Sequence, residues 1–111
     1  MTGKASRDRG ARWERDIAHH LIFRGWAHAK RELERRKDVG DIADGPRGVV
    51  LEAKDRGRYD FAGWLAQARK ARRTPDDLAV VVVKRRNFAV SEAFAVLTFD
   101  DLCTLMKEAG R

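Results

Sequence analysis

The chain has 111 residues, and 24 lysines and arginines against 17 aspartates and glutamates give it a net charge of +7. This length fits one domain with one modest core, and the basic excess favours a polyanion such as nucleic acid as partner, although the same charges could simply solvate helices. One cysteine, Cys103, excludes a disulfide framework or a multi-cysteine zinc site, and no apolar run approaches the roughly 20 residues that span a bilayer. We expect a soluble protein of the cytoplasm, or of the host cytoplasm if the source is a virus, with no membrane partner.

The N-terminal part of the chain predicts an arm and then a helix. Residues 1–8 are polar and basic and predict a flexible arm, which leaves residues 9–111 as the single folded domain. From Arg9 to Arg24 apolar residues recur at helical spacing, and Gly25 ends the pattern.

Three strands are predicted next. Residues 26–33 predict the first strand, although apolar and polar side chains alternate only weakly there. Residues 39–43 and 48–54 predict two strands paired through a turn at 44–47.

The second half of the chain predicts a helix over residues 60–73 and an apolar strand over 78–83, typical of a central strand covered on both faces. A strand–helix–strand unit of this kind predicts parallel strands. A short strand at 94–97 and a helix from Thr98, as its cap, to about residue 109 complete the chain. The predicted fold class is α/β, with an α-β-β-β-α-β core around a mixed sheet and a small C-terminal β-α extension.

Charged residues on the two predicted paired strands form the candidate site. Glu52 and Lys54 stand two positions apart, so their side chains leave the same face of a strand, and Asp41 on the neighbouring strand adds a second carboxylate. Two acids suit Mg²⁺, with Mn²⁺ as a substitute, and the backbone carbonyl of Ala53 is a natural third ligand. The alternative is a surface ion pair on an edge strand, because the sequence Glu-x-Lys is common.

This set of groups fits the hydrolysis of a phosphodiester bond, which requires charge neutralisation, a water of lowered pKa and a fixed line of attack. Asp41 and Glu52 would hold the metal, while Lys54 would orient or deprotonate the attacking water or meet the charge of the transition state. Glu14, near the middle of the first helix, could reach the site directly or through water. We expect a divalent ion to stabilise the fold, because it would relieve the repulsion between the two carboxylates.

The order of these motifs resembles the PD-(D/E)xK nuclease superfamily and, within it, the Holliday junction resolvases of archaeal and phage type. The segments that carry the resemblance are Gly10 to Arg15, Gly25-Trp26, Lys37 to Ile42 and Leu51 to Lys54, with weaker similarity through Gln67 and Val83-Lys84 to Leu97–Leu102. Two features depart from the family pattern: Gly40 replaces the usual proline before the aspartate, and Glu34 to Lys37 replace a glycine- and serine-rich stretch.

The resemblance implies a restriction-endonuclease-like fold and a homodimer that cuts branched double-stranded DNA, with Glu14, Asp41, Glu52 and Lys54 as working residues and Arg15 on a DNA phosphate. A dimer also follows from size, because one small site cannot cut two strands symmetrically. The alternatives are a less selective nuclease of the same superfamily and a catalytically silent DNA-binding subunit.

Basic and polar residues around the site are the candidate DNA contacts, although any single one could be a solvated surface residue. They are Arg15, Arg35, Arg36, Lys37, Arg56, Arg58, Gln67, Lys84, Arg85 and Arg86.

Overall fold

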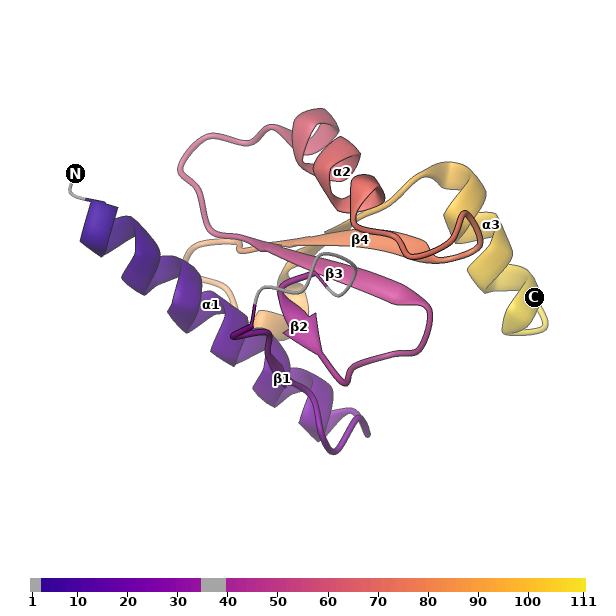
Figure 1. The fold of residues 1–111 in the computed structure, drawn as a ribbon, viewed down its shortest axis with the longest axis horizontal. Coiled ribbons are helices and arrows are strands. Elements are labelled where there is room, and N and C mark those ends of the chain that lie inside the picture. The colour runs from indigo at the N-terminus through magenta and orange to yellow at the C-terminus, as the bar shows by residue number, and fades with distance from the viewer. Residues whose placement is uncertain (1–2, 35–39) are drawn as a thin grey trace.

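The computed structural model describes residues 3–34 and 40–111, and over these residues the chain is an α/β fold whose elements follow the predicted order (Figure 1). The elements are α1 (Gly3–Phe23), β1 (Lys30–Arg31), β2 (Ile42–Ala43), β3 (Val49–Lys54), α2 (Phe61–Lys70), β4 (Leu78–Val83), a 3₁₀ turn η1 (Val90–Glu92), β5 (Phe94–Val96) and α3 (Phe99–Glu108). Residues Arg35, Arg36 and Lys37, three of the predicted DNA contacts, lie outside the described residues.

The helix α1 begins at Gly3, well before the predicted start at Arg9. Residues 3–8, predicted as part of a flexible arm, are therefore helical. Lysine, alanine and arginine are good helix formers, and Lys4 Nζ lies 3.0 Å from Asp8 Oδ2, one turn further along the helix. The extension matters because it brings the first turns of α1 to the candidate site.

The main sheet is mixed and has the strand order β3-β4-β5. β3 and β4 run parallel, from Val49 beside Leu78 to Lys54 beside Val83, and β4 pairs with β5 in the antiparallel sense. The predicted parallel strands around the second helix are thus confirmed. α2 begins at the cap residue Asp60, whose Oδ1 accepts a hydrogen bond of 3.0 Å from Gly63 N.

The predicted pairing of the second and third strands is wrong. β2 pairs instead with β1, Arg31 beside Ile42, in a separate two-stranded antiparallel sheet. The described part of this segment meets β3 through one bridge, between Gly40 and Leu51. The backbone at Gly40 has a φ of +79°, and a Cβ there would lie 2.8 Å from the Leu51 carbonyl oxygen. Glycine at position 40 therefore lets the backbone cross close to β3, and the next residues leave β3 to pair with β1.

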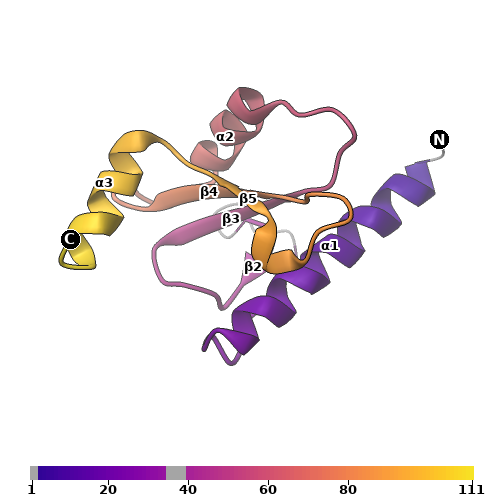
Figure 2. The ribbon, with the colours of Figure 1, turned by 180° about the vertical axis from the view of Figure 1, so that it is seen from behind.

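Two helices cover opposite faces of the main sheet, as Figures 1 and 2 show from two sides. α1 packs Trp13 and Ile17 against Leu51, whereas α2 packs Ala68 against Val81 on the other face. Alternate residues of β4 face alternate helices, because Val80 and Val82 pack with the α1 cluster and Val81 with the α2 cluster. Within the described ranges, no helix is both long and apolar enough to cross a membrane.

The last helix, α3, starts as predicted at the cap Thr98, whose Oγ1 accepts a hydrogen bond of 3.1 Å from Asp101 N. None of its residues is buried.

Candidate active site

An open pocket of about 510 Å³ lies where β3 ends, between α1 and α2. Its walls hold all four predicted working residues and also Ala53, Asp55, Arg56, Gln67, Arg31 and residues of the first turns of α1. Segments far apart in the sequence thus supply one cluster of acidic, basic and amide groups.

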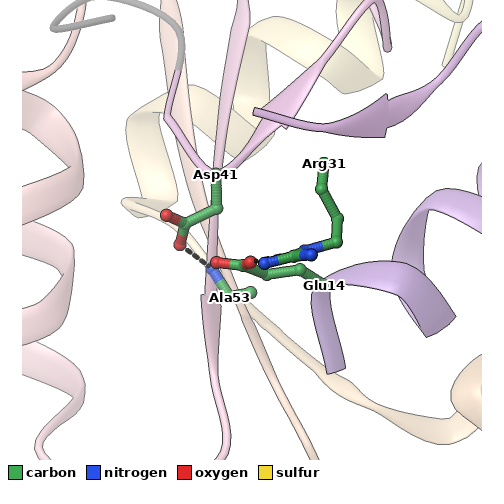
Figure 3. Close-up of polar contacts among 4 residues, drawn as sticks. All are labelled: Glu14, Arg31, Asp41 and Ala53. Carbon is green, nitrogen blue, oxygen red and sulfur yellow. Dashed lines mark hydrogen bonds and ion pairs between the residues drawn. The ribbon is translucent and has the colours of Figure 1, made fainter. Parts of the chain in front are cut away.

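Asp41 is fixed to the free edge of β3. Its Oδ2 accepts a hydrogen bond of 2.8 Å from Ala53 N (Figure 3). The backbone N of Asp41 donates a hydrogen bond of 2.9 Å to Leu51 O. These two bonds, rather than a β-hairpin, place Asp41 beside Glu52.

The carbonyl of Ala53 faces the same edge as Asp41. In a strand, the N–H and C=O of one residue point to one edge, and consecutive residues alternate between edges. Lys54 O accepts from Lys84 N on the β4 side, whereas Ala53 N donates to Asp41 on the other side. The arrangement is consistent with Ala53 O as a ligand beside the two carboxylates.

Glu52 is only 8% exposed, which is unusual for a charged residue. Burial, first, and then the charge and hydrogen bonding of Asp41 raise the pKa of Glu52 from 4.5 to about 8; Glu14 adds to the rise and Lys54 opposes it. An added positive charge beside Glu52 would favour the ionised form of its carboxyl group. Strongly shifted acids in a cleft are typical of functional sites.

Glu14 reaches the pocket from α1 and is held by an arginine that the sequence analysis missed. Arg31 Nε lies 3.0 Å from Glu14 Oε1, and both side chains are mostly buried (Figure 3). The pairing of β1 with β2 puts Arg31 there. Nothing in the spacing of residues 14 and 31 signals this contact.

Lys54 faces α2, and its Nζ donates a hydrogen bond of 3.2 Å to Gln67 Oε1. The structure thus places Gln67 in the pocket, next to the lysine. Lys84 does not line the pocket, and its Nζ lies 5.7 Å from the centre of the Trp13 ring on α1.

The predicted arginines divide between the pocket and its surroundings. Arg56 lines the pocket, whereas Arg86 and Arg85 line a neighbouring hollow. Arg15 lines a separate depression with Arg31. Arg58 is exposed and is not among the residues lining these pockets.

Asp55 was also missed, although it directly follows Lys54. Its side chain is 6% exposed, it lines the pocket, and its Oδ1 lies 3.7 Å from Arg86 Nη2. Its position one residue past the Glu-x-Lys motif was the available signal.

The donor set fits a hard cation such as Mg²⁺. Asp41, Glu52 and the Ala53 carbonyl offer oxygen atoms alone, and Mg²⁺ is usually held by one or two carboxylates with water and substrate oxygens completing its shell. Among residues 3–34 and 40–111, no group of three or more His, Cys, Asp and Glu side chains could hold a metal ion. Glu14 lines the same pocket and is paired with Arg31.

The chain matches no protein-family model, and no curated protein and no solved structure is significantly similar to it. Its resemblance to the PD-(D/E)xK nucleases thus depends on the short motifs themselves.

Proposed function

We propose that the protein is a magnesium-dependent endonuclease with a restriction-endonuclease-like fold that hydrolyses phosphodiester bonds in branched DNA as a homodimer, resolving four-way junctions. The observation that carries the proposal is the pocket at the end of β3, where Glu52 is buried beside Asp41, and Lys54 emerges on the same strand. Burying Glu52 beside the partly exposed Asp41 costs free energy, and a surface that only keeps the protein in solution does not require that cost.

Each side chain has a task in this proposal. Asp41, Glu52 and the Ala53 carbonyl would hold the cation, which when bound would supply Lewis-acid activation of water and of the phosphate. Lys54 would orient the attacking water and stabilise negative charge on the phosphate, and Gln67 holds its ammonium group by a hydrogen bond of 3.2 Å. Arg31 keeps the Glu14 carboxylate at the pocket wall.

The choice of branched DNA is supported by the family resemblance and by the net charge of +7. The retained Glu14, Asp41, Glu52 and Lys54 disfavour a silent DNA-binding subunit, because such a subunit does not need both acids and the lysine.

One assay separates the candidate activities. The protein is incubated with labelled four-way junction, nicked duplex and plain duplex, with and without magnesium. We expect magnesium-dependent cleavage of the junction, whereas equal cleavage of all three DNAs would indicate a less selective nuclease, and binding without cleavage a silent subunit.

Two variants test the site in the same assay. Asp41→Asn and Lys54→Ala should bind the junction but not cut it. Asp44→Asn, on the exposed turn after β2, and Lys70→Ala, at the end of α2, are matched controls and should cut normally. Cleavage that survives Asp41→Asn or Lys54→Ala would place the chemistry elsewhere.

A further inference from the structure

A group of aromatic rings next to the candidate active site is exposed to solvent. Phe88 is 54% and Tyr59 50% exposed, and Phe61 and Phe94 are each 38% exposed. We call Tyr59, Phe61, Phe88 and Phe94 the aromatic platform. Contiguous exposed apolar surface on a small protein commonly marks a binding site, whereas single exposed rings need no explanation.

Three of the four platform rings contact one another. Tyr59 stacks on Phe61 with 5.2 Å between ring centroids, and Phe94 meets Tyr59 edge-on at 6.0 Å. Phe61 and Phe94 are also in edge contact, at 6.2 Å. Such offset and edge-on geometry is favourable and positions these three rings relative to one another.

Three arginines lie beside these rings. Arg85 lies 3.8 Å from the centre of the Phe88 ring and 4.8 Å from that of Phe94, and its Nη1 donates a hydrogen bond of 3.2 Å to Glu92 O. Together with Arg56 and Arg86, it lines an open hollow of about 410 Å³ that includes Tyr59, Phe88 and Phe94. The hollow thus combines flat apolar rings with three guanidinium groups.

The hollow adjoins the candidate active site. Arg56 lines both cavities. Asp55, on the wall of the active-site pocket, lies 3.7 Å from Arg86, on the wall of the hollow. The two cavities therefore lie side by side, with Arg56 common to both.

We propose that the aromatic platform stacks unpaired bases of a DNA strand whose backbone runs into the active-site pocket. This inference rests on the proposed function and adds that bases beside the cleaved phosphate leave their base pairs when the branched DNA binds. Base–aromatic stacking tolerates any sequence, and a lining of arginines holds the backbone phosphates. A second copy of the chain fits less well, since a two-fold contact centred on the platform would place these arginines against their own counterparts.

The test compares binding of two DNAs without magnesium, so that no strand is cut. Both are duplexes of the same sequence, but one ends in a splayed, unpaired arm, and affinity is measured by fluorescence anisotropy. Phe88→Ala should weaken binding of the splayed DNA about tenfold and of the paired duplex by less than about twofold, because stacking requires an unpaired base. Tyr59→Ala should act in the same direction. Phe23→Ala removes a ring that is 81% exposed at the end of α1 and serves as the matched control.

Each outcome has a defined meaning. The inference is overturned if Phe88→Ala binds the splayed DNA as tightly as the wild type does, or if its affinity falls equally for both DNAs. Normal magnesium-dependent cleavage in the same preparation would then show that the proposed function still stands. A wild-type protein that neither binds nor cuts DNA overturns both. A wild-type dimer that becomes a monomer in Phe88→Ala, measured by sedimentation, assigns the platform to a second copy and also overturns the inference. If Tyr59→Ala does not fold, Phe88→Ala decides alone, because its ring is the more exposed.

Discussion

At the scale of single residues, the proton on Glu52 determines how the protein responds to pH. Burial and the neighbouring Asp41 raise the pKa of Glu52 from 4.5 to about 8. Between these values the folded protein keeps a proton that the unfolded chain has lost. Without divalent ions, this group therefore makes the free energy of unfolding fall as the pH rises from about 4.5 to about 8 and level off above.

Urea unfolding across that pH range measures this contribution. Glu52→Gln removes the titrating group, so its free energy of unfolding should decline less with pH and exceed that of the wild type at the alkaline end. An unchanged slope in Glu52→Gln would show that Glu52 does not carry the shifted pKa.

Metal binding at the same residue should displace this proton. Magnesium must compete with the proton on Glu52, so we expect magnesium affinity to rise with pH until about 8 and one proton to leave on binding below that pH. Calorimetric titration in two buffers of different ionisation enthalpy counts the proton released. Asp41→Asn should lose the binding and Asp44→Asn should keep it. If millimolar magnesium or manganese leaves the melting temperature unchanged, the proposed metal site at Asp41 and Glu52 would be contradicted.

At the scale of elements, the short pairing of β1 with β2 positions Arg31 against Glu14. Removing Arg31 would leave the mostly buried Glu14 carboxylate without this cation. Glu14 lies close enough to Glu52 to raise the pKa of Glu52, so its unshielded charge should raise that pKa further. We expect Arg31→Gln to reduce cleavage by at least about tenfold and to raise the pH at which cleavage is half-maximal. Arg31→Lys should recover part of both. A loss of cleavage without any shift of the pH profile would mean that Arg31 acts only on folding.

The crossing at Gly40 gives a second test at this scale. An added Cβ would approach Leu51 O to 2.8 Å at a φ of +79°. Gly40→Ala should therefore lower the free energy of unfolding by about 1–3 kcal/mol. It should also abolish stabilisation by magnesium, because Asp41 follows directly. Gly10→Ala, in α1 where a Cβ meets nothing within 4 Å, is the control and should raise the free energy of unfolding by up to about 1 kcal/mol. Similar effects of the two substitutions would contradict a special role for the crossing.

The sequence predicted the features that depend on local periodicity. The order of elements follows from helical spacing and strand-like apolar runs, and the parallel strands around α2 follow from the strand–helix–strand order. The common face of Glu52 and Lys54 follows from their two-residue spacing on β3. The partners of β1 and β2 could not be read in this way, because two-residue strands carry almost no pattern. Arg31 was missed for that reason. The start of α1 was misplaced because charged, exposed residues lack an apolar stripe even when they are helical.

At the scale of the whole molecule, the net charge of +7 predicts salt-sensitive DNA binding. If about six cationic groups neutralise phosphates, affinity should fall by about three decades between 50 and 200 mM salt, since each contact releases condensed counterions. Anisotropy titrations over this salt range measure the slope. A flat response would refute an electrostatic DNA surface on this protein.

The account as a whole depends on one geometric claim, that Asp41, Glu52 and the Ala53 carbonyl bind the same divalent ion. Anomalous scattering from crystals soaked in manganese locates that ion directly. We predict one strong peak between the Asp41 and Glu52 carboxylates that is missing in Asp41→Asn. Manganese bound at another place, or no peak at this site at saturating manganese, would contradict the claim.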